Sequence, residues 1–261
     1  MQERHQNDAL YFKDLAQGTR DCVIPYIESV KKIPENCVVL EVGCGRGGNL
    51  YPFLERGLRV VGIDKDDASV KFATEFFKNC GHVEKLTLLN ENFYEVDPDS
   101  VPKANLVVIR DVLEHMANRE SFFKRLKEFL ADDAIIFNAF PPWRMPFGGH
   151  HQGCKSKLLS KIPWLHLLPR VAFEAILRVF GEDEKYIKNL RAEVRDTKLS
   201  IYGYKRLLKR TGFKIEKETW YFINPSYKIK FGLTPRVLPG IMRLPHICDF
   251  YTTAHYSIIR R

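Results

Sequence analysis

Five short apolar runs, separated by segments with helical character, constrain the fold of this chain more than any other feature. The runs lie at Cys37–Val42, Arg59–Ile63, Lys85–Leu89, Asn105–Ile109 and Ala134–Asn138. Continuous apolar runs of this length are typical of strands that are buried on both faces. Because strands that alternate with helices form parallel sheets covered on both sides, the pattern predicts a doubly wound α/β fold with right-handed crossovers.

Further elements extend this core at both ends. Residues 8–31 are expected to be helical, as are residues 119–130 between the fourth and fifth strands. Ile201–Thr211 is amphipathic and is followed by Gly212, a typical helix end. Two more strands are expected near Phe213–Phe222 and Tyr251–Ile259. The sequence thus predicts a mostly parallel sheet of seven strands, with an insertion between the fifth and the sixth.

The first strand runs into a glycine-rich loop, Glu41-Val42-Gly43-Cys44-Gly45-Arg46-Gly47-Gly48-Asn49. Glycine is needed where a strand turns sharply into a helix and the backbone approaches a ligand. Part of the loop satisfies the GxGxxG pattern of dinucleotide sites, and Asp64 lies about where their acidic ribose ligand would be. Two details favour another nucleoside cofactor. Glu41 stands where dinucleotide sites usually have an apolar residue, and Gly47 extends the pattern to ExGxGxG.

The ExGxGxG pattern resembles motif I of the class I S-adenosylmethionine-dependent methyltransferases, and further segments extend the resemblance over residues 37–139. Val60–Asp64 resembles the second motif, whose acidic residue binds both ribose hydroxyls. Asn90–Phe93 resembles the loop that borders the adenine, although the family commonly has Asp where this chain has Asn92. Leu106–His115 resembles the fourth motif and has the VLEH ending frequent in ubiquinone-pathway and related small-molecule methyltransferases.

The resemblance implies a Rossmann-like methyltransferase fold and a cofactor, S-adenosyl-L-methionine, with S-adenosyl-L-homocysteine as the product. The expected cofactor-binding residues are Glu41, Gly43, Cys44, Gly45, Gly47, Asp64, Lys65, Asn92, Phe93 and Arg110. Two simpler roles stay open: Asp64 can cap the helix that follows it, and Glu114 and His115 can merely anchor a helix start. The family's sheet ends with an antiparallel strand pair, and the two C-terminal strands of this chain fit that order.

The chemistry of the acceptor is expected just after the fifth strand. Methyl transfer from a sulfonium is an in-line displacement, and a hydroxyl acceptor generally needs a base, usually His near neutral pH. There the chain offers aromatics, glycines and the adjacent His150 and His151. Either histidine is a candidate catalytic base or acceptor-orienting group. The alternative is that both bond only to neighbouring backbone, with His115 or Asp111 next in line as the base. Adjacent histidines without a carboxylate do not indicate a metal site, so no metal is expected.

Residues 158–180 allow two interpretations. As a lid, the segment would close over the acceptor with Trp164, Leu165, Leu168, Phe173, Ile176, Leu177 and Phe180. As an interfacial element, the same apolar face would rest on anionic lipid through Lys157, Lys161, Arg170 and Arg178. We favour the lid. The predicted organisation is a cofactor-binding core at 1–140, an acceptor-binding insertion at 141–200, and a C-terminal helix and two strands at 201–261.

The charge of the chain is distributed unevenly. Residues 1–133 contain 18 Lys and Arg against 23 Asp and Glu, whereas residues 134–261 contain 23 against 9. The excess can simply solubilise a surface, or it can meet a phosphorylated substrate, a membrane surface or nucleic acid. The leading hypothesis is an enzyme that methylates an oxygen atom of a small or lipid-linked metabolite. This metabolite can be anionic.

Two other hypotheses are an RNA methyltransferase that uses the basic half, and a cofactor-binding subunit without catalysis. Against the first, the sequence has no separate RNA-binding module, no base-clamping motif after the fourth strand and no cysteine nucleophile there. The oligomeric state is not predicted.

Cysteine usage and the N-terminus bear on location. The six cysteines are scattered without a CxxC pair, which indicates free thiols and no zinc site. The first residues lack the apolar core of a secretory signal, and no apolar run of 18 residues occurs. We therefore expect a cytoplasmic protein. The alternative is a protein that binds peripherally to the inner membrane surface.

Overall fold

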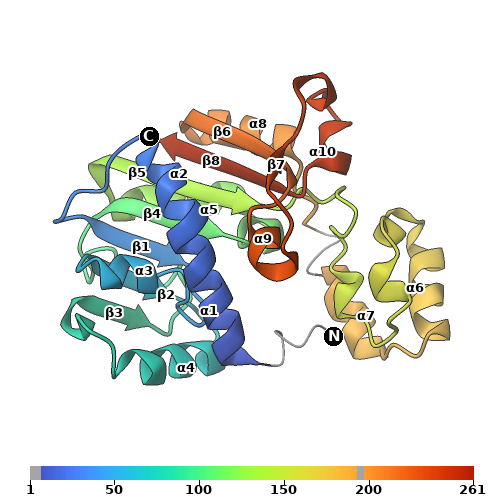
Figure 1. The fold of residues 1–261 in the computed structure, drawn as a ribbon, viewed down its shortest axis with the longest axis horizontal. Helices are drawn as coiled ribbons and strands as arrows, with labels where there is room; N and C mark the ends of the chain where they lie inside the picture. Colours follow the sequence, from blue (N-terminus) through green and yellow to red (C-terminus); the bar gives the residue numbers. More distant parts are fainter. Residues whose placement is uncertain (1–6, 193–196) are drawn as a thin grey trace.

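The computed structural model describes residues 7–192 and 197–261. In this part of the chain the strands form one sheet in the order β3-β2-β1-β4-β5-β8-β6-β7 (Figure 1). The strands are β1 Val38–Val42, β2 Arg59–Ile63, β3 Leu86–Leu89, β4 Ala104–Arg110, β5 Leu130–Phe140, β6 Lys214–Ile223, β7 Arg236–Val237 and β8 Ala254–Arg260. The first five are parallel, and β8, β6 and β7 are antiparallel to their neighbours. The predicted doubly wound α/β fold is confirmed.

The expected number of seven strands is wrong, because β7 adds an eighth strand to the edge of the sheet at β6. A strand of two residues shows no apolar periodicity, so the sequence pattern does not reveal it. The two antiparallel strands that were expected correspond to β6 and β8.

Helices cover both faces of the sheet. They are α1 Asp8–Gly18, α2 Ile24–Glu28, α3 Tyr51–Glu55, α4 Asp67–Phe77, α5 Arg119–Leu126, α6 Arg170–Val179, α7 Glu184–Leu190, α8 Ile201–Thr211, α9 Ser226–Phe231 and α10 Cys248–Tyr251. The helix expected at 8–31 is divided, since a π-helical turn at Thr19–Val23 separates α1 from α2. The helix expected at 119–130 ends at Leu126, because β5 already begins at Leu130.

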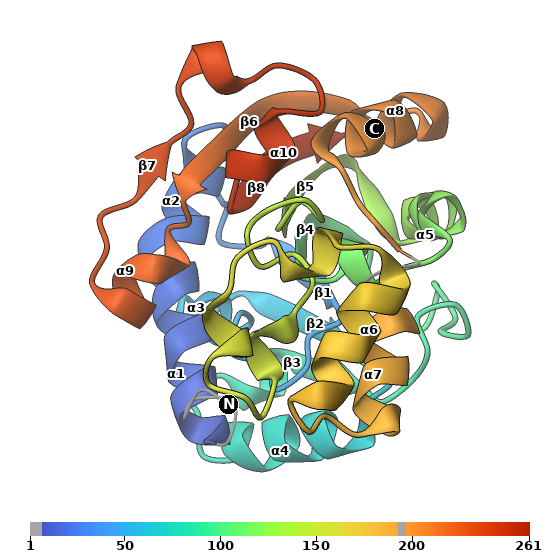
Figure 2. The same cartoon turned by 90° about the vertical axis from the view of Figure 1, so that its right-hand side faces the viewer.

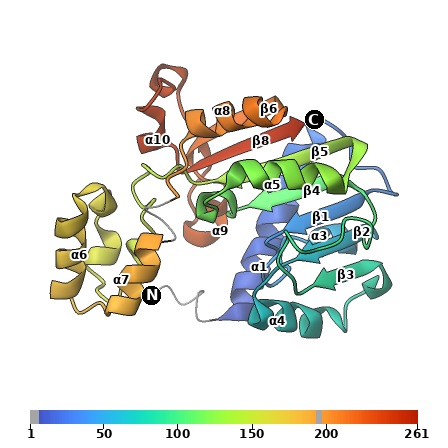
Figure 3. The same cartoon turned by 180° about the vertical axis from the view of Figure 1, so that it is seen from behind.

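Successive strand residues point to opposite faces and build two cores. Val39 and Val60 face a core with side chains of α1 to α4, whereas Leu40 and Val61 face a core with side chains of α5 and α8. The two helix layers are seen from opposite sides in Figures 1 and 3. Continuous apolar runs are therefore required in the central strands, because both of their faces are buried.

Residues 151–191, here called the α6–α7 unit, lie beyond the carboxyl ends of the parallel strands (Figures 1 and 2). The unit has a core of its own, formed by Cys154, Leu159, Leu165, Phe173, Leu177, Ile187 and Leu190. Three of the side chains expected to face an acceptor, Leu165, Phe173 and Leu177, are thus buried inside the unit instead. This part of the expectation is wrong because the insertion is long enough to build a second core.

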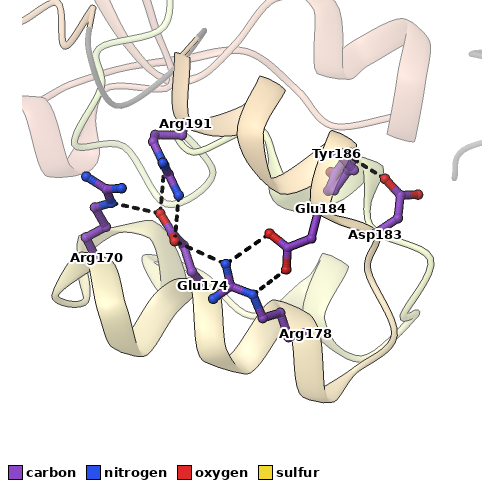
Figure 4. A network of polar contacts seen from close by, with 7 residues as sticks. All are labelled: Arg170, Glu174, Arg178, Asp183, Glu184, Tyr186 and Arg191. Atoms are coloured by element: carbon purple, nitrogen blue, oxygen red, sulfur yellow. Dashed lines mark hydrogen bonds and ion pairs between the residues drawn. The ribbon is translucent and has the colours of Figure 1, made fainter.

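A polar network ties α6 to α7 (Figure 4). The carboxylate of Glu174 on α6 accepts hydrogen bonds from Arg170 Nε at 3.0 Å and from Arg191 Nε and Nη2 at 2.8 and 2.7 Å. It also forms an ion pair with Arg178, which donates in turn to Glu184 on α7. Two of the basic side chains expected to meet lipid, Arg170 and Arg178, are therefore paired within the unit.

Candidate functional site

A cavity of about 660 Å³ lies at the carboxyl ends of β1, β2, β3 and β4. It is lined by Val42, Gly43, Ile63, Asp64, Lys65, Glu91, Asn92, Phe93, Tyr94, Asp111, Val112, His115, Met116, Ala117, Asn118 and Ser121. This volume lies within the range of small-molecule sites, and ligands of open α/β sheets bind at this edge. Five of the expected cofactor residues line the cavity: Gly43, Asp64, Lys65, Asn92 and Phe93.

The glycine loop after β1 has a backbone that side chains rarely adopt. Gly43 and Gly47 have φ angles of +75° and +78°, and a Cβ at either position would lie 2.7 Å from Val112 Cγ2 or Phe77 Cε2, respectively. Gly45 also has a positive φ, +49°, but a Cβ there would have no atom within 4 Å. Packing thus requires glycine at two positions, whereas at position 45 only the positive φ favours glycine.

Asp64 follows β2 and is held by the backbone around it. Its Oδ2 accepts a hydrogen bond from Gly45 N at 2.7 Å, and its Oδ1 accepts one from Asp66 N at 2.9 Å. A carboxylate has about four acceptor positions, so both oxygens can accept further hydrogen bonds from a ligand in the cavity. The helix α4 that follows is capped by Asp66 rather than by Asp64, because Asp66 Oδ2 accepts from Ser69 N.

The loop after β3 forms another wall of the cavity. Asn92 Oδ1 accepts a hydrogen bond from Tyr94 N at 3.3 Å, which leaves its side chain at the cavity surface. The ring of Phe93 packs against Phe122 and Phe129 at centroid distances of 5.3 and 5.0 Å, so it joins the wall to the core beneath. Tyr94 was not expected from the sequence, although it directly follows the motif.

Glu41 and Arg110 lie behind the glycine loop and do not line the cavity. Glu41 Oε1 accepts from Asn49 Nδ2 at 2.7 Å, and Asn49 Oδ1 accepts from Arg110 Nη1 at 3.0 Å. Burial raises the pKa of Glu41 to about 8, although Asn49 and Arg110 lower it. Its Oε2 is buried without a hydrogen-bond partner among the described residues. Glu41 and Arg110 therefore support the loop through Asn49, which was not among the expected cofactor-binding residues.

The remaining expected cofactor residues, Cys44, Gly45 and Gly47, also do not line the cavity. Cys44 is buried, and a Cβ at Gly62 on β2 would lie 2.9 Å from its Sγ. The side chain of Cys44 therefore packs the loop against the sheet.

The adjacent histidines after β5 have different surroundings. His151 is fully buried in the α6–α7 unit, with Nε2 at 2.7 Å from the carbonyl oxygen of Ile162. His150 is partly buried, and its ring lies edge to face with His115 at a centroid distance of 5.0 Å. Burial, together with the nearby His115, lowers the pKa of His150 to about 4. Of the two candidates, His150 is thus the one that approaches the cofactor-side cavity.

His115 connects two cavities. It lines the large cavity, and it also lines a small one of about 10 Å³ together with Glu114, Pro141, Trp143, Gly148, His150 and Leu199. Such a volume is close to what one water molecule needs. Burial raises the pKa of Glu114 well above its ordinary value.

Asp111, at the end of β4, has a φ of +56°, which is uncommon for a residue other than glycine. Its backbone N–H donates to Ala139 O at 2.9 Å, and its side chain borders the large cavity. A strained residue at a cavity wall is an indication of function. Asp111 and His115, considered from the sequence only as second-choice bases, thus lie at the candidate site.

Comparisons with known proteins agree with this architecture. Residues 40–136 match a protein family described as a methyltransferase domain. The chain is 31% identical over 97 residues to the ubiquinone biosynthesis O-methyltransferase of Rickettsia conorii. This match covers 37% of the present chain and 32% of that protein. It is 25% identical over 111 residues to the (S)-tetrahydroprotoberberine N-methyltransferase of Eschscholzia californica. That match covers 41% of the present chain and 30% of the relative. The chain thus spans about a third of the length of these curated relatives.

Solved structures show the same fold. The magnesium protoporphyrin IX methyltransferase of Synechocystis PCC 6803, with bound SAH, has a TM-score of 0.56 at 15% identity, over 98% of this chain and 87% of that chain. A putative sarcosine dimethylglycine methyltransferase from Galdieria sulphuraria has a TM-score of 0.59 at 12% identity, over 100% and 90%. Residues 40–136 therefore form a methyltransferase domain. The predicted relationship to class I S-adenosylmethionine-dependent methyltransferases is confirmed.

None of the helices in residues 7–192 and 197–261 is long and apolar enough to cross a bilayer. Within the same residues, no cluster of three or more His, Cys, Asp or Glu side chains has an arrangement that could hold a metal ion.

Proposed function

We propose that this chain is an S-adenosylmethionine-dependent methyltransferase that acts on a small or lipid-linked metabolite, with oxygen as the atom methylated. The observation that carries the proposal is the 660 Å³ cavity at the ends of β1 to β4, where the glycine loop, Asp64 and Asn92 meet. Support for a small acceptor comes from the relatives, whose names refer to ubiquinone biosynthesis and to (S)-tetrahydroprotoberberine. The RNA and non-catalytic hypotheses have no such support.

The residues around the cavity fit the cofactor that the resemblance implies. Asp64, already fixed by Gly45 N and Asp66 N, would accept hydrogen bonds from the two ribose hydroxyls. Asn92 would lie at the adenine, where its amide can both donate and accept. Gly43 and Lys65 would border the rest of the nucleoside. When bound, the cofactor supplies an activated methyl group, so the protein mainly has to align the acceptor and exclude water.

We further propose that His150, and not His151, removes the proton of the acceptor. The pKa of about 4 keeps the imidazole of His150 neutral near pH 7, although it also makes this imidazole a weaker proton acceptor than an ordinary histidine. His115 lies between it and the large cavity, so a proton taken beside the cofactor could reach either imidazole. His151 has its Nε2 engaged by Ile162 and its ring buried, which fits a structural role.

The α6–α7 unit would then close the acceptor side of the site. This agrees with the organisation predicted from the sequence, a cofactor-binding core at 1–140 and an acceptor-binding insertion at 141–200. Its position beyond the carboxyl edge of the sheet supports this role (Figure 2). The side chains that would face an acceptor are those outside the unit's own core, including Trp164, Leu168 and Phe180, which are more than a third exposed.

Cofactor binding is tested by calorimetry with S-adenosylhomocysteine. Asp64→Asn should weaken binding about tenfold to a hundredfold, because a hydrogen bond to a charged group is worth about 1.5–3 kcal/mol. Asp66→Asn is the matched control, since this neighbour caps α4 and does not line the cavity, and its affinity should be unchanged. Tight binding of NAD without any binding of S-adenosylhomocysteine would refute the assignment.

The base is tested with labelled S-adenosylmethionine and cell extract, followed by mass analysis of the product. On the acceptor so found, His150→Gln should lower the rate constant by about a hundredfold to ten-thousandfold without changing cofactor affinity. The matched control is His151→Gln, whose amide can still donate to Ile162 O and which should retain most activity.

Wild-type turnover should also stay level as pH falls from 7 to about 5, because His150 has a pKa of about 4. An unperturbed imidazole would instead lose activity near pH 6.5. Equal activity of both variants and the wild type would make the two histidines structural.

A further inference from the structure

Residues 231–247, here called the apolar protrusion, lead from α9 through β7 toward α10 and project beyond the edge of the sheet (Figures 1 and 2). The segment is short of regular structure, with β7 and a 3-10 helix at Gly240–Met242. Leu238 is buried and Met242 is partly buried, but six other large hydrophobic side chains are exposed to solvent: Phe231 53%, Leu233 45%, Val237 49%, Ile241 85%, Leu244 55% and Ile247 46%. So many exposed apolar side chains on one segment mark an interaction surface rather than ordinary surface residues.

The charge around the apolar protrusion has one sign. Residues 219–248 contain four Lys and Arg, at 228, 230, 236 and 243, and no Asp or Glu. Lys228, Arg236 and Arg243 are exposed. Aliphatic side chains flanked by basic ones, without a carboxylate, are complementary to an anionic bilayer, which offers acyl chains below and phosphates above.

The segment considered from the sequence for this role, residues 158–180, is less suitable. Its helix α6 exposes Val171 at 80% and Val179 at 82%. However, Arg170 and Arg178 on that helix are paired with Glu174, so much of their charge is neutralised within the α6–α7 unit. In the part of the chain that the structure describes, Lys228, Arg236 and Arg243 form no ion pair with a carboxylate, and residues 219–248 contain no Asp or Glu.

Two other partners fit the observations less well. A symmetric contact with a second copy would bring the same surface patch together twice, and the basic side chains would then face one another without an acidic partner. Single-stranded nucleic acid is bound by aromatic side chains on which bases stack. Of the six exposed side chains of the protrusion, Phe231 alone is aromatic, so they offer no series of rings on which successive bases could stack.

We propose that the apolar protrusion docks the protein on the surface of an anionic lipid bilayer. Ile241 and Leu244 enter the boundary between headgroups and acyl chains, while Lys228 and Arg236 lie among the lipid phosphates. The protrusion lies toward the same end of the molecule as the α6–α7 unit, at the carboxyl edge of the sheet (Figures 1 and 3). Docking would therefore bring the candidate site close to the membrane, but the inference does not depend on methyl transfer.

The experiment is co-sedimentation of the full chain with vesicles of phosphatidylcholine, with and without phosphatidylglycerol. The wild type should bind the mixed vesicles and bind pure phosphatidylcholine weakly. Ile241→Asp with Leu244→Asp should lower the partition coefficient about tenfold or more, because two aliphatic side chains are lost from the interface. Lys228→Gln with Arg236→Gln should lower it by about fivefold for each charge removed.

The matched control is Val171→Asp with Val179→Asp on α6, which changes two aliphatic side chains that are 80% and 82% exposed and should leave vesicle binding unchanged. Retained binding of S-adenosylhomocysteine by every variant shows that the fold is intact, and it separates this proposal from that of the cofactor site. The proposal is overturned if the wild type does not bind anionic vesicles, or if only the α6 variant loses binding. It is equally overturned if light scattering shows a dimer that the Ile241→Asp and Leu244→Asp changes dissociate, with vesicle binding unaffected.

Discussion

Replacing Glu174 by Gln removes the central charge of the network in Figure 4. The carboxylate side chain is 8% exposed and is contacted by three arginines, whose own side chains are 30% to 57% exposed. A glutamine keeps one acceptor oxygen, but its NH₂ group would face the donors of Arg170 or Arg191. A hydrogen bond to a charged group is worth about 1.5–3 kcal/mol, and breaking a fully buried pair costs about 3–5 kcal/mol. Because the arginines can be partly rehydrated, we expect a loss of about 2 kcal/mol.

The loss should be local, since the α6–α7 unit has a core separate from the two cores of the sheet. Hydrogen exchange measured by mass spectrometry should therefore show faster exchange in α6 and α7, by about thirtyfold, with little change in β1 and β4. Proteolysis should likewise cut the variant within the α6–α7 unit first.

The control is Glu184→Gln, which removes a carboxylate that also binds Arg178 but is 71% exposed. Surface ion pairs contribute little, so hydrogen exchange in this variant should stay close to that of the wild type. Equal exchange in both variants, or wild-type exchange in Glu174→Gln, would refute the idea that burial of Glu174 makes the network stabilising.

The same network predicts a dependence on pH. Burial raises the pKa of Glu174, but the hydrogen bonds from Arg191 and Arg170 outweigh it and hold this pKa below its ordinary value of 4.5. The folded state thus releases the proton more readily than the unfolded state does. The stabilisation is fully present above pH 4.5 and is lost as pH falls through the lower pKa of the folded state.

Two further predictions concern the glycine loop and its support. Gly43→Ala should lower the unfolding free energy by about 1–3 kcal/mol, because of its positive φ and the clash with Val112. Gly45→Ala, which has no neighbour to clash with, should cost less in the same thermal unfolding assay. Glu41→Gln should remove a pH dependence: since the folded pKa of Glu41 is about 8, wild-type stability should fall between pH 4.5 and 8 by up to about 1.4 kcal/mol per pH unit relative to the variant. Parallel stability profiles would contradict this.

Periodicity and motif spacing alone identified most of the fold. Runs such as Val38–Val42 and Arg59–Ile63 are mostly apolar because central strands are buried on both faces, and that requirement is visible in a single segment. The glycine loop is equally local, since the positive φ angles of Gly43 and Gly47 restrict the residue type at those positions. The resemblance to class I S-adenosylmethionine-dependent methyltransferases was carried by this loop and by the motifs after the later strands.

The tertiary structure decided which side chains meet. His150 and His151 are adjacent and chemically identical, yet one lies against His115 and the other against Ile162. Their difference depends on residues distant along the chain, which no local pattern contains.

The same reason applies to charge and exposure. Arg110 was expected at the cofactor, but it donates to Asn49 and to Ser226, which is 116 residues further along the chain. The basic excess of residues 134–261 was visible in the sequence, whereas its division between paired arginines on α6 and an exposed apolar protrusion was not. Sequence thus determined what each segment must bury. Only the folded chain determined which charges are paired and which apolar side chains remain at the surface, because both depend on contacts between distant segments.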